Sequence, residues 1–413
     1  MNNIKTKAPN YTFALIVMFA VLFLIGFITT MNNSMIEFCK QAFNLKDSQG
    51  QLVNTAFYGA YALSIPFGLM MNKIGYKKTL LLGLAIVGIG FIINYLGISS
   101  LLGMETSVIY SVFLGSMFIV ALGIVMLQLV ANPYVMVLGS PEKGAFRMTL
   151  ANALNSAATT VAPVFITYVI IAGKAPTPDA VPTPYLGLGI FTLILCAILF
   201  FMKLPNINEA EQAEEASGEH KEYKSSVFKY PHVWLGMLGI FFYMGIELGV
   251  PSMLPAYFKS NPSLLDYGTA TEFLSYYWGG MMIGRFAGAI ILNKFKPRHI
   301  LSVCLICGAI CVATSFVLSG IASVYAMLAA GLFHSVMWPL VFNLGLQELG
   351  PHTKAASGII NLGVVGGATL PLVMGAIVDN PALGVGYAIA LMFVYYIYVF
   401  WFCNFGSKIG LKK

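Results

Sequence analysis

Long runs of apolar residues, separated by short polar turns, cover almost the whole chain. About 20 apolar residues are needed to cross the hydrocarbon core of a bilayer as a helix, and twelve of these runs have that length. They lie at 11–36, 52–72, 78–98, 107–137, 147–172, 184–203, 231–258, 269–293, 298–318, 322–347, 354–379 and 383–407. The pattern therefore predicts an all-α membrane protein with twelve transmembrane helices.

One long polar stretch, NINEAEQAEEASGEHKEYKSS at 206–226, separates the sixth run from the seventh. Its low hydrophobicity is typical of a linker that forms no core of its own. We therefore predict an N-terminal six-helix half at 1–203, a cytoplasmic linker at 204–229 and a C-terminal six-helix half at 230–413.

The two predicted halves repeat one another. The turn GLMMNKIGYKKTL at 68–80, after the second span, has a counterpart in AIILNKFKPRHIL at 289–301, after the eighth. The fourth and tenth spans each carry a proline near the middle, Pro133 and Pro339, which removes a helical hydrogen bond and frees a backbone carbonyl. Two parallel six-helix repeats are typical of a transporter whose halves rock about a site between them.

Composition and charge agree with this class. Hydrophobic residues make up 58% of the 413 residues and charged residues only 9%, with a mean hydropathy of +0.81, which excludes a soluble fold. Eighteen of the 23 Lys and Arg residues fall in loops on the side of both termini and four in loops on the other side. This asymmetry predicts cytoplasmic termini for a multi-pass membrane protein. The net charge of +7 therefore sets topology and indicates no nucleic-acid partner.

Polar amides interrupt the fourth and fifth spans. Gln128 and Asn132 share one face of the fourth, and Asn152, Asn155 and Thr159 share one face of the fifth. An amide facing lipid without a partner costs several kcal/mol, so these groups must point into protein or into a wet cavity. Hydrogen bonding between helices is the alternative for any single amide. Because so many amides occur on adjacent helices, we favour a solute-binding cavity.

Two charged residues lie inside predicted spans, where charge is costly. Glu247 lies near the middle of the seventh span, and Arg285 is the one basic residue within a span. Glu247 could pair with Arg285 as a structural ion pair, or bind a sugar hydroxyl, a sodium ion or a proton. Arg285 could likewise hold two helices together, donate to a sugar oxygen, or change partners during transport.

Further candidate substrate ligands lie on other spans. Asn33 lies near the extracellular end of the first span, and Tyr58 belongs to a stripe on the second. In the second half Trp338 supplies an aromatic face, and Asn343 and Asn361 supply amides. An aromatic ring beside hydrogen-bonding groups suits a pyranose, because a sugar has apolar C–H faces and a rim of hydroxyls.

Several stretches resemble a known family. GLMMNKIGYKK at 68–78 is similar to the inter-helix motif of the major facilitator superfamily, with Asn72 where the family usually has Asp. Across the chain the sequence resembles the fucose–proton symporter family, which includes bacterial glucose/galactose transporters. The similar pieces are MNNSMIEFCKQAF (31–43), LQLVANPYVMVLG (127–139), FRMTLANALNS (146–156), YMGIEL (243–248), IGRFAG (283–288) and WPLVFNLGLQELG (338–350).

The departures from that family concern ionisable groups. The resemblance implies an Asp in the first helix and a Glu in the fourth at the positions that Asn33 and Gln128 occupy here. Amides can bind sugar hydroxyls but carry no proton at physiological pH. Glu247 stands where the fucose symporter has a neutral Gln and where sodium-linked glucose/galactose relatives typically have Glu. The resemblance also implies a ligand-facing aromatic at Trp338.

The sequence thus predicts a secondary active transporter that imports a neutral monosaccharide, a hexose such as glucose, galactose or fucose, with sodium or a proton by alternating access. An uncoupled uniporter is the alternative, because two acids are missing, and a sugar-sensing receptor is a further one. No nucleophile triad, metal cluster or nucleotide-binding motif indicates an enzyme, and we expect no cofactor beyond the co-transported cation. We expect a monomer that has the sugar, the cation and the lipid bilayer as its partners.

Overall fold

The computed structural model describes residues 11–45, 47–50, 52–139, 143–165, 177–180, 182–202, 204, 223–267, 270–380 and 382–411. Within this part of the chain every regular element is a helix. The first half comprises α1 (Thr12–Ala42), α2 (Asp47–Gly50), α3 (Leu52–Gly59), η1 (Ala60–Leu63), α4 (Ser64–Ser100), α5 (Thr106–Val137), α6 (Gly144–Phe165), η4 (Pro178–Ala180) and α7 (Pro182–Phe201).

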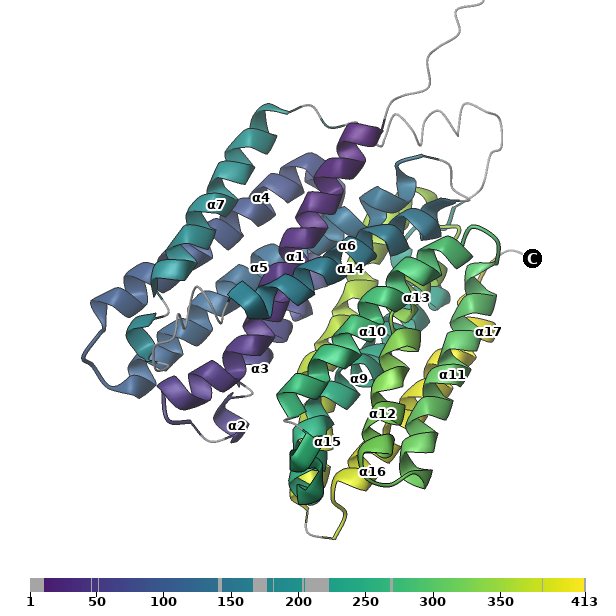
Figure 1. Cartoon of the computed structure of the whole chain (residues 1–413). Coiled ribbons are helices and arrows are strands. Elements are labelled where there is room, and N and C mark those ends of the chain that lie inside the picture. Colours follow the sequence, from purple (N-terminus) through teal and green to yellow (C-terminus); the bar gives the residue numbers. More distant parts are fainter. Residues whose placement is uncertain are drawn as a thin grey trace, which may run out of the picture.

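The second half contains shorter helical pieces. Its elements are η5 (Val227–Lys229), α9 (Pro231–Ser260), η6 (Pro262–Tyr267), α10 (Ala270–Ile291), α11 (Pro297–Val317), α12 (Ile321–His334), α13 (Met337–Gly345), η7 (Gly350–His352), α14 (Thr353–Leu362), η8 (Gly363–Val365), α15 (Gly366–Asp379), α16 (Val385–Ala390), α17 (Met392–Asn404) and η9 (Gly406–Lys408). Figure 1 shows α1–α7 gathered on one side of the molecule and most of the later helices on the other.

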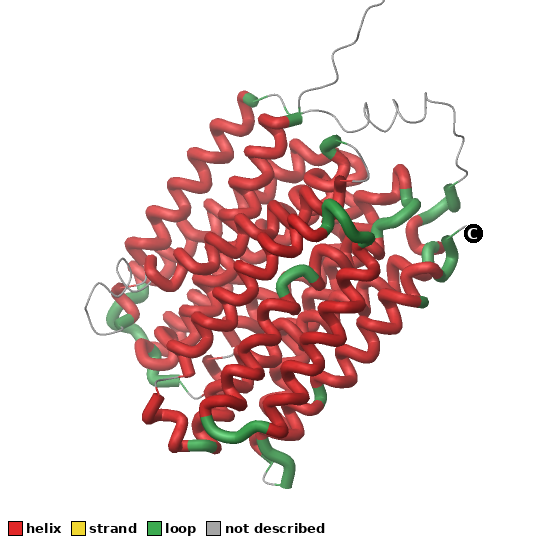
Figure 2. Tube along the Cα trace, turned by 45° about the vertical axis from the view of Figure 1, so that its right-hand side comes forward, coloured by secondary structure: helices red, strands yellow, loops and turns green. Residues whose placement is uncertain are grey.

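The twelve predicted spans are confirmed. Nine helical stretches in the described residues are long and apolar enough to cross a membrane. One of them, Leu52–Ser100, holds two spans, because the backbone leaves the helical conformation at Gly75 (φ 82°). The more polar helices α6 and α10 complete the set of an all-α, twelve-span architecture. The long helices run roughly parallel, and most described loops gather at the two ends of the bundle (Figure 2).

The outward faces of the peripheral helices are apolar, as a lipid environment requires. On α7, Phe191, Ile194 and Ile198 are all more than half exposed, and on α11 the same holds for Val303 and Ile310. A contiguous apolar surface of this kind would be unstable in water. The chain therefore folds as a multi-pass membrane protein.

Several spans are broken in the middle, and these breaks lie near prolines or glycines. The tenth span divides into α12 and α13 just before Pro339, and the eleventh passes through the 3-10 turn η8 at Gly363–Val365. The fourth span, by contrast, continues as one helix through Pro133. The broken backbone lies inside the protein, where side chains can satisfy the freed carbonyls.

The two halves meet closely at the end of the bundle that is predicted to be cytoplasmic. A Cβ built on Gly68 of α4 would lie 2.9 Å from the Cα of Gly358 of α14, so only glycine allows this approach. Nearby, the ammonium of Lys354 lies 4.9 Å from the ring centroid of Tyr76. The predicted linker at 204–229 lies mostly outside the described residues, and the boundaries of the two halves stay a prediction.

Candidate functional site

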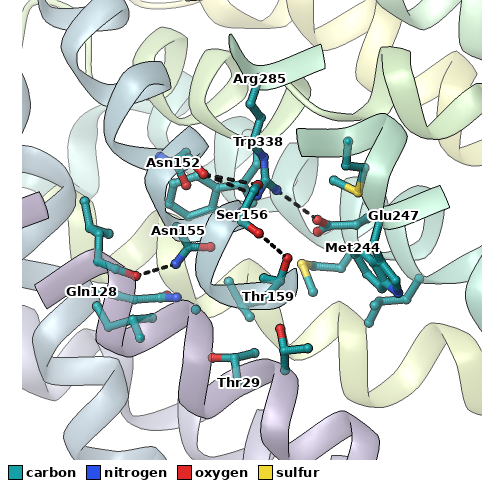
Figure 3. A pocket seen from close by; sticks show the side chains of 18 of the residues that line it. Thr29, Gln128, Asn152, Asn155, Ser156, Thr159, Met244, Glu247, Arg285 and Trp338 are labelled. Carbon is teal, nitrogen blue, oxygen red and sulfur yellow. Dashed lines mark hydrogen bonds and ion pairs between the residues drawn. The ribbon is translucent and has the colours of Figure 1, made fainter. Parts of the chain in front are cut away.

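A cavity lies between the two halves. It encloses about 870 Å³ of space not filled by protein atoms, including its open mouth. The first half contributes side chains from α1, α3, η1, α5 and α6, and the second half contributes side chains from α9, α10, α13 and η8. The polar and aromatic lining residues are Thr29, Thr30, Tyr58, Tyr61, Gln128, Asn132, Asn152, Asn155, Ser156, Thr159, Glu247, Trp278, Arg285 and Trp338 (Figure 3).

The amides of the fourth and fifth spans all reach this cavity, as their spacing predicts. The Gln128 Oε1 atom and the Asn132 Nδ2 atom are buried and have no hydrogen-bond partner among the described residues. A buried polar atom without a partner is costly, so each such atom calls for a ligand or a water molecule. Both side chains belong to the cavity wall, so α5 contributes to it one acceptor and one donor that have no protein partner among the described residues.

The amides of α6 are partly engaged with the protein. The Asn155 Nδ2 atom donates to the Leu22 carbonyl of α1 at 2.7 Å, and the Asn152 Nδ2 atom donates to the Met148 carbonyl at 2.9 Å. Gly26 allows α1 to approach, since a Cβ there would lie 2.6 Å from the Asn155 carbonyl oxygen. These bonds orient both side chains, so each amide has one role in packing and a second as part of the cavity wall.

Glu247 and Arg285 form an ion pair in the cavity wall. Arg285 Nη2 lies 3.4 Å from Glu247 Oε1, and the two side chains are 9% and 14% exposed, respectively. The pair that the sequence suggested is therefore present, and both residues also line the cavity. Because the two charges neutralise one another, the site holds no net charge that would select an ionic solute.

Arg285 also connects the two halves. Its Nε atom donates to the Ser335 carbonyl at 3.0 Å, and its Nη1 atom donates to the Asn152 carbonyl at 3.4 Å and to the Ser156 hydroxyl. A planar guanidinium holds five N–H donors on three nitrogen atoms in a fixed fork, so it reaches acceptors that are too far apart for the single nitrogen of an ammonium. Ser156, one turn from Asn152 on the same face of α6, went unnoticed in the sequence, although its spacing of four residues could have revealed it.

Aromatic rings form part of the remaining wall. Trp338 is half-buried and stacks on Phe342 with ring centroids 5.0 Å apart and an interplanar angle of 13°. Tyr58 and Tyr61 lie 6.3 Å apart between ring centroids. An indole held in place by stacking offers a rigid apolar face at little entropic cost. The cavity thus combines rings and amides, the two features expected for sugar recognition.

Two predicted ligands lie away from the cavity. Asn343 lies five residues beyond Trp338, about 140° around α13, so it faces away from the indole's side. Asn361 is fully buried on α14, one turn from Gly358, where the halves are in contact. Neither lines the cavity in this conformation, and their role as substrate ligands stays a prediction. Asn33 lies in α1, and its side chain is outside the described part of the structure.

Comparison with known proteins shows which class of protein this chain belongs to. Residues 18–371 match the sequence profile of the Major Facilitator Superfamily. The chain is 36% identical over 411 residues to a glucose/galactose transporter of Brucella abortus, covering 98% of this chain and 96% of that protein. It is 26% identical over 396 residues to the L-fucose-proton symporter of Escherichia coli, covering 90% and 88%. The relatives are thus membrane transporters and not enzymes.

The fold agrees with solved structures of that class. The transporter FucP in the outward conformation superposes with a TM-score of 0.76 at 24% identity, covering 96% of this chain and 99% of that one. The proton:xylose symporter XylE superposes with a TM-score of 0.72 at 16% identity, covering 96% of each chain. The chain belongs to the Major Facilitator Superfamily, as its resemblance to the fucose–proton symporter family predicted.

Proposed function

We propose that the protein is a secondary active transporter that imports a neutral hexose together with a cation. The observation that carries this proposal is the cavity between the halves, in which amides with unpaired polar atoms stand beside aromatic rings and a single neutralised ion pair. The names of the relatives, glucose/galactose transporter and L-fucose-proton symporter, support the same class of solute.

The chemistry of the wall favours a neutral polyhydroxylated solute. Gln128 Oε1 can accept from a hydroxyl and Asn132 Nδ2 can donate to one, while Trp338 and Trp278 can cover a C–H face of the ring. An anionic substrate would need basic groups free of an internal partner, and Arg285 already contacts Glu247, Ser335 and Ser156. A monosaccharide therefore fits the described groups better than a charged metabolite.

We place cation coupling at Glu247. Its carboxylate offers hard oxygen ligands that suit sodium, and the same group could bind a proton instead. Either cation would weaken the ion pair with Arg285, whose guanidinium also reaches Asn152 and Ser156 of the opposite half. Occupation of Glu247 would thus alter a contact between the halves, which is what coupling requires.

An uncoupled uniporter is the second candidate. Gln128 lines the cavity as an amide that cannot titrate, and Glu247 already has an internal partner in Arg285. With no cation site the protein would equilibrate the sugar across the membrane and never accumulate it.

The proposed setting is a bacterial inner membrane, with both termini cytoplasmic and halves at 1–203 and 230–413 acting as two rigid units of a monomer. The contact of Gly68 with Gly358 then closes the cytoplasmic end of the cavity. This arrangement favours entry of the sugar from the opposite side. Transport requires that this contact opens while the other end closes.

The test is uptake of radiolabelled hexoses into proteoliposomes under an inward sodium gradient, an inward proton gradient or no gradient. Accumulation above equilibrium with one cation supports symport. Equilibration that neither gradient changes supports the uniporter.

A further inference from the structure

Helix α9 carries a proline one turn beyond Glu247. In a regular helix the Glu247 carbonyl would accept from the backbone N–H of residue 251, but that residue is Pro251, which has no N–H. The carbonyl of Glu247 instead accepts a hydrogen bond from a side chain of another helix. The Tyr277 hydroxyl of α10 donates to it at 2.8 Å.

A histidine fixes the direction of that hydrogen bond. Tyr277 Oη lies 2.8 Å from His334 Nδ1, and His334 Nε2 contacts the hydroxyl of Tyr396. A carbonyl only accepts, so the single hydroxyl proton of Tyr277 is committed to Glu247. His334 Nδ1 must then carry its own proton and donate to Tyr277, and Nε2 accepts from Tyr396. All three side chains are buried, at 0% to 4% exposed.

A second side chain of α10 donates to a backbone carbonyl that a proline leaves without a helical partner. Ser335 lies four residues before Pro339, so its carbonyl also lacks a helical partner, and Arg285 Nε donates to it at 3.0 Å. Tyr277 and Arg285 lie about two turns apart on α10. One helix thus holds the backbone at Glu247 and the guanidinium that pairs with the Glu247 carboxylate.

We propose that Tyr277, oriented by His334, is a positioning residue that fixes Glu247 for cation binding by occupying the carbonyl that Pro251 leaves free. This inference rests on the proposed coupling role of Glu247. Without the Tyr277 hydroxyl the carbonyl would be left buried and unpaired, and α9 would shift to find a partner. The distance between the Glu247 carboxylate and Arg285 would then change, and the cation site with it.

The test restores the missing donor. In Tyr277→Phe we expect the cation concentration for half-maximal sugar uptake to rise about tenfold, since one buried hydrogen bond is lost. Pro251→Ala returns an N–H to residue 251, which can donate to the Glu247 carbonyl. When Pro251→Ala is combined with Tyr277→Phe, the cation concentration for half-maximal uptake should therefore lie within about twofold of the value for Pro251→Ala alone. Pro255→Ala combined with Tyr277→Phe is the matched control, because its new N–H lies one turn too far along α9. It should not restore cation affinity.

Two outcomes overturn the proposal. Tyr277→Phe could match the wild type, or the Pro251→Ala double variant could remain as impaired as Tyr277→Phe. A purely packing role of the ring would give the first result, because Phe keeps the ring and loses only the hydroxyl. His334→Asn keeps a donor near the Nδ1 position, so it should impair cation affinity less than His334→Leu, and equal impairment also counts against the proposal.

Failure of the proposed function gives a different pattern. Should the wild type show no cation dependence, four proteins are compared by thermal unfolding in detergent: the wild type, Tyr277→Phe, Pro251→Ala and the double variant of these two substitutions. A lower melting temperature in Tyr277→Phe that Pro251→Ala restores supports the hydrogen-bond assignment without coupling. Absence of that restoration overturns it.

Discussion

Gly68 and Gly358 face each other backbone to backbone across the two halves. A Cβ on Gly68 would lie 2.9 Å from the Cα of Gly358, and a Cβ on Gly358 would lie 2.7 Å from the Ser64 carbonyl oxygen. No larger side chain fits either position without moving one half away from the other. This contact joins the two halves at the end of the bundle that is predicted to be cytoplasmic, where the proposed function requires the cavity to be closed.

Replacement of Gly358 by Val should therefore separate the halves at this end and slow transport, while sugar binding persists. Spin labels at the exposed positions Lys73 and Glu348 would report a longer distance between these two positions in a variant without native cysteines. Gly187→Val is the matched control, because a Cβ there meets nothing within 4 Å. An unchanged distance in Gly358→Val would show that the contact does not hold the halves together.

Gln128→Ala should weaken sugar binding by about 2- to 13-fold, the range that corresponds to one hydrogen bond of 0.5–1.5 kcal/mol. The reason is that Gln128 lines the cavity and that its Oε1 atom has no partner among the described residues. Titration calorimetry on the purified protein gives the affinity. Asn94→Ala is the control, because the Asn94 amide is buried outside the cavity wall and donates to the Ser116 hydroxyl at a distance of 2.7 Å. This substitution should change stability and leave sugar affinity unchanged. Equal affinities for Gln128→Ala and wild type would remove Gln128 from the site.

Arg285→Lys should lower the uptake rate by about 10-fold or more, since charged hydrogen bonds are worth about 1.5–3 kcal/mol each. Arg285 reaches Ser335, Ser156 and Glu247 from three different nitrogen atoms, which a single ammonium group cannot do. Initial uptake rates at saturating sugar measure the effect. Normal rates with Lys would mean that charge alone is needed and that the fixed geometry of the guanidinium is not.

Asn361→Leu should leave sugar affinity unchanged and should not lower the melting temperature. Both polar atoms of this amide are buried without a partner among the described residues, and the residue lies away from the cavity wall. Replacing an unsatisfied buried amide by an apolar group of similar size is neutral or stabilising. Binding titration and differential scanning fluorimetry check the two parts. A loss of affinity would restore Asn361 to the list of sugar ligands.

The sequence predicted the spans and the cavity well because both follow from the cost of polar groups in hydrocarbon. That cost placed Gln128, Asn132, Asn152 and Asn155 inward, and all four line the cavity. Glu247 and Arg285 could be recognised as partners for the same reason, and the pair is present at 3.4 Å. Residue type alone thus determined which side chains avoid lipid.

Asn343 and Asn361 show where that reasoning ends. Asn361 is fully buried and Asn343 is partly exposed, but neither lines the cavity in this conformation. Which interior surface a helix presents depends on its rotation and on breaks such as the one between α12 and α13. The role of Pro251 was likewise invisible, because the donor that replaces its N–H, Tyr277, comes from another helix. Such long-range pairs follow from packing and not from local pattern.

The most direct test of the account compares wild type with Glu247→Gln in proteoliposomes that are given an inward sodium or proton gradient. The wild type should accumulate labelled hexose above equilibrium with one of the two cations. Glu247→Gln should still exchange sugar across the membrane but should only equilibrate it, because the amide cannot bind the cation as the carboxylate does. Gradient-driven accumulation by Glu247→Gln at the wild-type level would contradict the assignment of cation coupling to this residue.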